Sequence, residues 1–371
     1  MSQNHPKSSS LLVEGSEVRL EVSTCPKVSI IIVNYNTLHQ LKRCLPSLQC
    51  LNYQDYEVIV VDNASIDGSA DYIEQEFPEF RVIRSSENLG YTGGNNGGFK
   101  YATGDYIAVL NPDTKMEPDW LSRLVGALES NPHAGLAVGK LLFMNDDALI
   151  NSCGLDITFT GLSFLRGLGE PAGHYAEPAT VFGVAGSAFL IRRRLYEELD
   201  GFDELLFTYY DDTDLSLRAN IAGYTCIYVP EAVGFHDYTF KFSERKCFIQ
   251  ERNRYYSLLT TLLVPTIILL LPTLILSEII AWGFAVLQGP KHAWGKLQSH
   301  IWLIKNWRRV YQARRKVQRL RRISDRVLLS RFSWKIIFYK TTKSWLEKPL
   351  AIAFNPMTFV WGKVCQAIIF W

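Results

Sequence analysis

Residues 104–114 read Gly-Asp-Tyr-Ile-Ala-Val-Leu-Asn-Pro-Asp-Thr, a short apolar run that stops at Asn-Pro-Asp. The run 106–110 predicts a buried strand, and Pro112 ends it because proline has no N–H for a sheet ladder. The pattern places the carboxylate of Asp113 at the carboxyl end of a strand, where open α/β sheets bind ligands. Two interpretations stay open here: a site that holds a divalent metal, and an ordinary Asx-Pro turn.

Strand and helix patterns alternate on both sides of this stretch. Runs of β-branched and other apolar residues predict strands at 28–33, 57–61, 81–83, 106–110 and 134–138. Helical spacing predicts helices at 38–50, 66–77, 93–102 and 120–130. Strands that alternate with helices usually pair in parallel, with helices on both faces. The sequence therefore predicts a doubly wound, mostly parallel α/β sheet, followed after about residue 150 by a less regular α+β half.

Charge is divided unevenly along the 371 residues, although the net charge is only +2. Residues 289–371 carry 18 Lys+Arg against 2 Asp+Glu, whereas residues 1–288 carry 21 against 35. A basic tail on an acidic body indicates an anionic partner surface. No recognised nucleic-acid module accompanies the charge, so a membrane is predicted and nucleic acid is not. Seven scattered cysteines without a C-x-x-C pair favour a reducing cytosol, and the polar N-terminus does not resemble a signal peptide.

An apolar run occupies residues 258–287, interrupted by Pro265, Pro272 and Glu278. It is longer than the roughly 20 residues that cross a bilayer. Lys and Arg flank it on both sides, so both ends look cytoplasmic by the positive-inside rule. This pattern favours a re-entrant hairpin or an in-plane anchor, bent near one of the two prolines. A full span and a buried core helix remain as alternatives.

The basic tail contains a second membrane signal. Residues 301–322 combine apolar residues at helical spacing with Lys and Arg elsewhere, which is typical of a helix on anionic lipid headgroups. The alternative is a solvated basic helix packed on its own domain. Residues 350–371 are again mostly apolar, which predicts a second segment that dips into the membrane.

Polar or glycine-rich stretches follow four of the predicted strands. Their candidate residues are Asn34, Asn36, Asp62, Asn88, Gly90, Gly94, Asn95, Asn111 and Asp113. Because the carboxyl ends of parallel strands meet at one edge of a sheet, we expect these residues to form one site. The glycines allow backbone N–H groups to approach an anion at a helix N-terminus. A simple turn at Asp62 and tight packing of the glycines remain as alternatives.

A second acidic cluster, residues 209–218, reads Tyr-Tyr-Asp-Asp-Thr-Asp-Leu-Ser-Leu-Arg. Neighbouring carboxylates repel, so at least one should keep its proton to higher pH or pair with a cation. Such a carboxylate suits a general base for a hydroxyl, and an acidic helix N-terminus is the alternative. His236 ends a later apolar segment. With Asp113 it can complete a hard-metal site, or it can be a structural histidine.

Taken in order, these motifs resemble those of the family 2 inverting glycosyltransferases, and they lie closest to the bacterial rhamnosyltransferase-like branch. The motifs occupy residues 28–36, 61–69, 88–98, 105–114 and 201–218. The resemblance spans about residues 27–256. It implies a GT-A fold that binds a nucleotide-diphosphate sugar.

The resemblance also implies roles for individual residues. Asp62 matches the nucleobase or ribose contact of the family. Asn111 to Asp113 stand where the family has D-x-D, so Asp113 would hold Mg²⁺ or Mn²⁺, with His236 as a further ligand. Asp212 matches the catalytic base of the Glu-Asp motif, whose first acid here is Asp211. The implied contacts to the nucleotide sugar are Asn34, Asn36, Asp62, Asn88, Gly90, Gly94, Asn95, Asn111 and Asp211.

The Q-x-x-R-W motif of processive synthases is absent, since residues 250–255 read Gln-Glu-Arg-Asn-Arg-Tyr. The predicted reaction is therefore non-processive transfer of a sugar, such as the deoxyhexose rhamnose, to a glycan or polyprenyl-linked acceptor. We expect it at the cytoplasmic face of the cell membrane, in cell-envelope polysaccharide synthesis. One alternative is a catalytically inactive, membrane-attached scaffold. A sugar-phosphate nucleotidyltransferase is disfavoured, because residues 34–37 read Asn-Tyr-Asn-Thr instead of a glycine-rich loop with Arg and Lys.

The predicted division of the chain has four parts. Residues 1–26 form a flexible leader, and residues 27–256 form the GT-A domain. Residues 257–288 form a membrane-embedded or re-entrant segment, and residues 289–371 form a basic amphipathic membrane-associated region.

Overall fold

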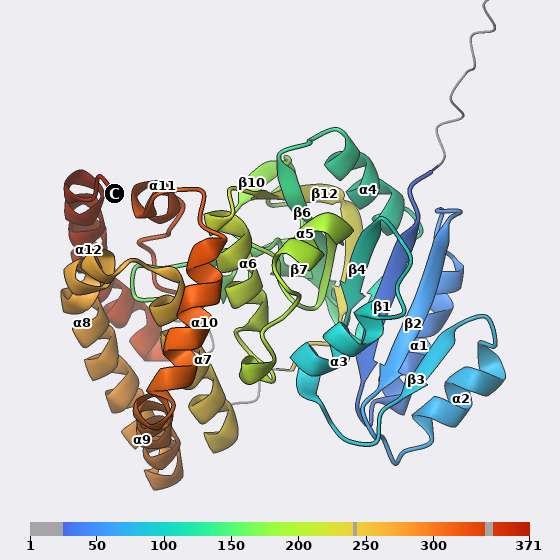
Figure 1. The fold of residues 1–371 in the computed structure, drawn as a ribbon, viewed down its shortest axis with the longest axis horizontal. Coiled ribbons are helices and arrows are strands. Elements are labelled where there is room, and N and C mark those ends of the chain that lie inside the picture. Colours follow the sequence, from blue (N-terminus) through green and yellow to red (C-terminus); the bar gives the residue numbers. More distant parts are fainter. Residues whose placement is uncertain (1–24, 240–242, 338–343) are drawn as a thin grey trace, which may run out of the picture.

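The computed structural model describes residues 25–239, 243–337 and 344–371, so nearly all of the predicted leader lies outside the described residues. Its centre is a mixed sheet with the strand order β10-β12-β6-β11-β4-β1-β2-β3 (Figure 1). The neighbours β4, β1, β2 and β3 are parallel, and β11 runs antiparallel between β4 and β6. The strands are β1 (Val28–Asn34), β2 (Tyr56–Asp62), β3 (Arg81–Arg84), β4 (Tyr106–Leu110), β5 (Thr114–Met116), β6 (Ala134–Phe143), β7 (Asp146–Ser152), β10 (Ala179–Val181), β11 (Ala188–Arg192) and β12 (Thr225–His236).

Helices cover both faces of this sheet, which confirms the predicted doubly wound α/β fold. Ile30 and Ile32 of β1 point into one hydrophobic core, and Ile31 points into the other. All three side chains are fully buried, which explains why β1 is an unbroken apolar run rather than an alternating one. The helices are α1 (Leu38–Gln49), α2 (Ser69–Glu76), α3 (Gly90–Phe99), α4 (Trp120–Glu129), α5 (Arg193–Glu198) and α6 (Asp211–Ile221).

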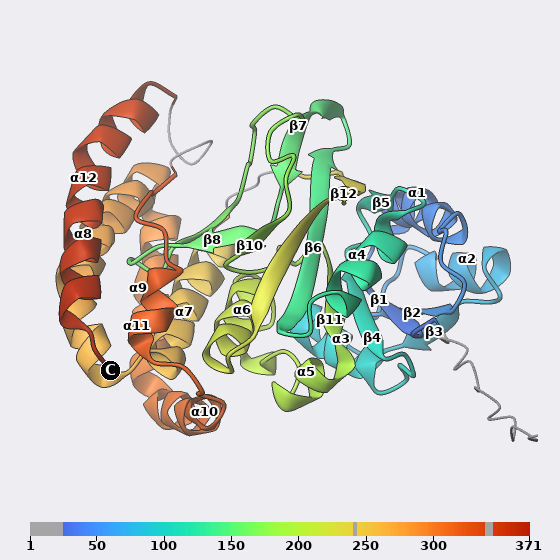
Figure 2. The same ribbon diagram turned by 90° about the horizontal axis from the view of Figure 1, so that it is seen from above.

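Further helices form a layer at the end of the sheet away from β3, as Figures 1 and 2 show. They are α7 (Glu244–Thr261), α8 (Val264–Gln288), α9 (Pro290–Lys305), α10 (Trp307–Arg319), α11 (Asp325–Ser330) and α12 (Ser344–Ile368). A small hairpin, β8 (Leu155–Ile157) with β9 (Ser163–Leu165), lies between this layer and the sheet. Helix α7 packs against α6. Because α7 runs from Glu244 to Thr261, the predicted domain boundary at residues 256/257 falls inside a continuous helix.

The apolar run is split between two helices. The chain leaves the helical conformation at Leu262 and Leu263, directly before Pro265, which confirms a bend there, whereas Pro272 lies inside α8. By length and composition α8 is long and apolar enough to cross a membrane, with a mean hydropathy of 2.1 in its most apolar part. Only 28% of that part is buried, which is not the environment of a core helix.

The prediction of one continuous basic helix over residues 301–322 is wrong. The chain breaks at Asn306, which ends α9 and precedes α10, and whose side-chain Nδ2 donates a hydrogen bond to the carbonyl of Trp302. Val310 and Val317 of α10 are buried in cores shared with the body. Part of the apolar side of this helix therefore packs on the protein, as the alternative interpretation had it, whereas Trp307 and Tyr311 are 60% and 56% exposed.

Candidate active site

The ends of β1 and β2 are joined by side chains. Parallel pairing aligns Asn34 with Asp62, and Asn34 Nδ2 donates to Asp62 Oδ1 at 2.6 Å and to Ser69 Oγ at 2.7 Å. Asp62 Oδ2 accepts from the backbone N–H of Ser65 at 3.1 Å. Asn36, with a positive φ of 54°, accepts from the N–H of Ile66. These contacts fix the loop after β2, so the polar residues do more than form an isolated turn.

The glycine-rich stretch forms helix α3, and its first turn uses its N–H donors within the protein. The carbonyl of Phe207 accepts from the N–H groups of Tyr91 and Thr92, and Asn88 Oδ1 accepts from Gly90 N. A Cβ at Gly90 would lie 2.4 Å from the same carbonyl, and φ there is +73°. Because these donors are occupied, no anion-binding role is proposed for this turn.

Two later positions on α3 were also predicted to bind the nucleotide sugar. A Cβ at Gly94 would lie 2.6 Å from Val33 Cγ1, so this glycine is needed for packing on β1. Asn95 is fully buried, and its Nδ2 donates to the carbonyl of Tyr91. The tight-packing alternative therefore accounts for Gly94 without a ligand.

Asp113 and His236 meet beyond the end of β4. Strand β5 pairs antiparallel with β12 so that Thr114 lies opposite His236. His236 Nε2 lies 3.3 Å from Asp113 Oδ1, and the histidine is only 6% exposed. Among the described residues, buried Asp113 Oδ1 accepts no hydrogen bond. The two predicted metal ligands, 123 positions apart in sequence, therefore face each other.

Asp212 lies in the first turn of α6, where the helix N-terminus stabilises negative charge. Its Oδ2 accepts from the N–H of Gly186 at 2.9 Å, and its Oδ1 accepts from the N–H of Thr213 at 2.6 Å. Burial raises the pKa of Asp212, and these hydrogen bonds oppose the rise. The pKa of Asp211 is raised well above its usual range, first by burial and then by the charge of Asp212. The pKa values of these two neighbouring acids are thus raised to different extents.

The third acid of this cluster has a structural partner. Asp214 is 1% exposed and accepts from Arg218 Nε at 2.7 Å, as the i,i+4 spacing predicts, and from Ser257 Oγ at 2.8 Å. It joins α6 to α7 and does not line the cavity described next.

A cavity of about 490 Å³ brings part of the predicted site together. Asn111, Asp211, Asp212 and His236 line it, whereas Asp113 is not in its wall and contacts only the wall residue His236. The other candidates, at the ends of β1 and β2 and along α3, are not in its wall. They are Asn34, Asn36, Asp62, Asn88, Gly90, Gly94 and Asn95.

Several wall residues were missed by the sequence interpretation. Tyr91 donates from its hydroxyl to the carbonyl of Gly186 at 2.6 Å, and so supports the segment that holds Asp212. Phe164 of β9 and Phe284 of α8 add apolar surface, and Arg254 of α7 adds a cation. Of these residues, Tyr91 lies inside the glycine-rich motif, so its position in the sequence could have indicated that it belongs to the site. Arg254 and Phe284 reach the cavity through the packing of the C-terminal helices, and Phe164 reaches it from the β8–β9 hairpin.

Arg254 belongs to a buried cluster of charges shared by three helices. Its Nη2 lies 2.8 Å from Glu251 Oε2 and 2.9 Å from Glu278 Oε1. Lys296 of α9 contacts the same two carboxylates at 2.5 and 3.1 Å, and His300 lies 3.2 Å from Glu278. The acid inside the apolar run therefore ties α8 to α7 and α9.

Comparison with known proteins shows which proteins part of this chain is similar to. Residues 29–200 match the model of glycosyl transferase family 2. The chain is 30% identical over 224 residues to the uncharacterized protein y4gI of Sinorhizobium fredii, which covers 57% of this chain but only 24% of that protein. It is 29% identical to the N-acetylglucosaminyl-diphospho-decaprenol L-rhamnosyltransferase of Mycobacterium tuberculosis over 230 residues. This aligned region covers 56% of this chain and 75% of that enzyme.

A solved structure shares the fold. GalNAc-T7 with UDP, GalNAc and Mn²⁺ superposes with a TM-score of 0.54 at 18% identity, over 64% of this chain and 48% of that one. The chain thus spans about a quarter of the first relative and about half of this solved chain.

Proposed function

From the match of residues 29–200 to glycosyl transferase family 2, we propose that the chain is a glycosyltransferase of this family, and we propose the reaction that it performs. It moves a sugar, a deoxyhexose such as rhamnose, from a nucleotide-diphosphate donor to a hydroxyl of a glycan or lipid-linked acceptor. Transfer is non-processive, inverts the anomeric centre and serves cell-envelope polysaccharide synthesis. The observation that carries the proposal is the carboxylate of Asp212, which lies on one cavity with Asn111 and His236. The similarity to a rhamnosyltransferase supports the choice of sugar.

Asp212 acts as the general base. A base must be ionised to take the proton of the acceptor hydroxyl as that hydroxyl attacks the sugar. The N–H groups of Gly186 and Thr213 stabilise the ionised carboxylate and aim it at the cavity. Burial and the charge of Asp212 raise the pKa of Asp211 well above its usual range, so Asp211 keeps its proton to higher pH and, when protonated, can donate a hydrogen bond to the donor.

Asp113 and His236 would hold Mg²⁺ or Mn²⁺. Carboxylate oxygen and imidazole nitrogen are suitable ligands, and the buried Oδ1 of Asp113 has no other partner among the described residues. Their 3.3 Å separation is close to the roughly 3 Å between neighbouring ligand atoms of an octahedral ion with bonds of about 2.1 Å. No third His, Cys, Asp or Glu joins them in the described chain, which leaves positions for diphosphate oxygens. The ion would neutralise the leaving diphosphate.

The remaining candidates belong to the donor end. We propose that Asp62 and the loop that Asn34 and Asn36 stabilise contact the nucleoside, while Asn111 faces the sugar diphosphate. Asn88, Gly90, Gly94 and Asn95 shape α3 beside them.

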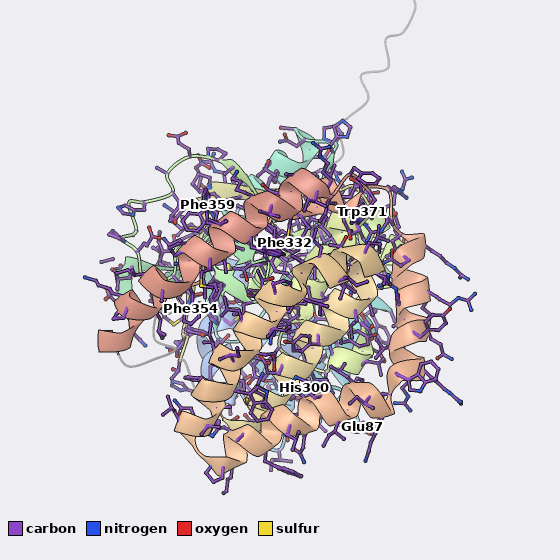
Figure 3. All side chains as sticks on the ribbon, turned by 90° about the vertical axis from the view of Figure 1, so that its left-hand side faces the viewer. Glu87, His300, Phe332, Phe354, Phe359 and Trp371 are labelled. Carbon is purple, nitrogen blue, oxygen red and sulfur yellow. The ribbon has the colours of Figure 1, made fainter. Side chains whose placement is uncertain are left out.

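The helical layer supports our proposal that the reaction takes place at a membrane. The apolar side chains of α8 that are exposed recur along one side of the helix, at Val264, Ile268, Leu271, Ile275 and Ile279. Figure 3 looks onto this layer, where α12 lies beside α8, and Trp361 of α12 donates to the carbonyl of Leu269. We propose that this face lies in the plane of the cytoplasmic leaflet and that the basic residues of α9 and α10 contact anionic headgroups. We propose that residues 27–256 carry out catalysis. Residues 257–288 anchor the protein in the membrane, and residues 289–371 bind the membrane surface.

The test is a donor panel of dTDP-, UDP- and GDP-sugars with Mn²⁺, run on the wild-type chain and on Asp212→Asn. We expect one donor to be used, and the variant to bind that donor with unchanged affinity while transfer is abolished. Turnover at the wild-type rate in the variant overturns the assignment of the base. A wild-type chain that binds no donor and transfers no sugar supports the inactive scaffold instead.

A further inference from the structure

Asn151 contacts the proposed metal ligand from behind. It lies on β7, is fully buried, and its Oδ1 is 2.9 Å from His236 Nδ1. Both β7 and β12 pair with β6, which brings these two residues together across 85 positions of sequence. Nothing in the local sequence around Asn151 indicates this contact.

The contact decides which ring nitrogen carries the proton. An amide oxygen can only accept, so the hydrogen bond requires a proton on His236 Nδ1. The neutral ring then has its lone pair on Nε2, the nitrogen that faces Asp113 Oδ1 at 3.3 Å. Two acceptors in this position repel each other unless a cation or a proton lies between them.

We propose that Asn151 is a positioning residue that holds His236 in the tautomer able to bind the divalent ion through Nε2. The inference rests on the proposed function, since it concerns the ion of that same site. A hydrogen-bond partner behind a metal-bound histidine fixes the tautomer and the ring orientation, and losing it typically weakens metal binding about 10–100-fold. The reverse amide orientation has the opposite result: Nδ2 would donate to Nδ1, and Nε2–H would donate to Asp113.

The experiment compares Asn151→Ala and Asn151→Asp with Ser152→Ala, a matched control at the next buried position of β7. Free Mn²⁺ is measured by electron paramagnetic resonance, with Mn²⁺ alone and with UDP, GDP or dTDP. We expect Asn151→Ala to weaken Mn²⁺ binding about 10–100-fold. Asn151→Asp retains the acceptor and should bind within about threefold of wild type, as should Ser152→Ala.

Nitrogen NMR of the metal-free protein, with labelled histidine, gives a second readout that does not depend on the ion. We expect His236 to carry its proton on Nδ1 in the wild type, and this preference to be lost in Asn151→Ala. A proton on Nε2 in the wild type overturns the inference, and so does Mn²⁺ binding by Asn151→Ala that equals that of Ser152→Ala. Both results leave the Asp212 assay untouched, so they are distinguishable from a failure of the proposed function.

Discussion

Two adjacent carboxylates at the start of α6 have different surroundings. Asp212 accepts N–H groups from Gly186 and Thr213, whereas Asp211 is only 6% exposed and has the charge of Asp212 beside it. The pKa of both is raised, but only that of Asp211 is raised well above the usual range. Asp211 therefore keeps its proton to higher pH than Asp212 does, so Asp212 is the first of the two to ionise.

This difference predicts the pH dependence of transfer. A base works only when ionised, so kcat/KM should fall as the pH falls through the pKa of Asp212, which burial raises above the ordinary value of an aspartate. Because Asp211 keeps its proton to higher pH than Asp212 does, Asp211→Asn replaces a neutral carboxyl by a neutral amide over this acid limb and should leave the limb in place. Asp212→Asn should lower kcat about 10²–10⁴-fold at every pH. Rate profiles from pH 4 to 9 test both, and a limb displaced by about one unit in Asp211→Asn contradicts the assignment of charge.

Among the elements, α3 shows how one residue type serves two purposes. Gly94 faces β1, where a Cβ would lie 2.6 Å from Val33, but a Cβ at Gly97 would meet nothing within 4 Å. Gly94→Ala should therefore destabilise the fold by about 1–3 kcal/mol through overpacking. Gly97→Ala, the matched control, should be neutral or stabilising by up to about 1 kcal/mol, because alanine favours a helix. Urea unfolding of both variants is the measurement, and equal effects would contradict the packing argument.

A second element-scale prediction concerns the charges that join α7, α8 and α9. Lys296 is fully buried between Glu251 and Glu278. Lys296→Ala leaves those carboxylates with less compensation, so unfolding should become easier by about 3–5 kcal/mol. Lys291→Ala, at an exposed position of the same helix, should change stability by less than about 0.5 kcal/mol. Chemical denaturation followed by circular dichroism compares them, and a loss below about 1 kcal/mol for Lys296→Ala would show that the cluster is not stabilising α9.

The strands were predictable because each apolar run records burial on both faces of the sheet. The run 106–110 coincides with β4, and Asp113 follows its carboxyl end as predicted. Asp212 lies in the first turn of α6, a position that the sequence analysis had given only as the alternative. Element ends were less predictable. The helix expected from Ile66 begins at Ser69, because the intervening loop is held by Asn36 and Asp62, residues from other elements.

Contacts between distant segments could not be predicted. The break at Asn306 accompanies a local hydrogen bond to Trp302 and the packing of α10 on the body of the protein. The spacing of apolar residues in the sequence is the same with or without this break, so the spacing could not predict it. The partners of Glu278 lie on two other helices, and Asn151 meets His236 only because β6 lies between their strands. Sequence spacing carries the geometry of one helix or strand, and these features depend on how several are arranged.

At the scale of the whole molecule, one helical layer takes part in both the cavity and the exposed apolar face. Phe284 of α8 lines the cavity that holds Asp212, while Ile268 and Ile275 of the same helix are 61% and 58% exposed. A lipid-linked acceptor bound near α8 would have its hydroxyl end close to the base. The exposed side of α8 is therefore expected to determine where the enzyme works.

This expectation is tested by the double variant Ile268→Asp/Ile275→Asp. Burying an isoleucine contributes about 1.5–3 kcal/mol, so losing two should weaken partitioning by at least about 100-fold. Vesicles with 30% anionic lipid, sedimented with the full chain, provide the measurement. Ile66→Asp is the matched control, because Ile66 is 93% exposed but lies on the loop after β2, away from this layer. Wild-type binding should also weaken with salt, since the basic residues of α9 and α10 contribute through screened charge. If the double variant sediments with vesicles as the control does, the α8 face does not bind the membrane, and the in-plane anchor is wrong even if transfer activity is intact.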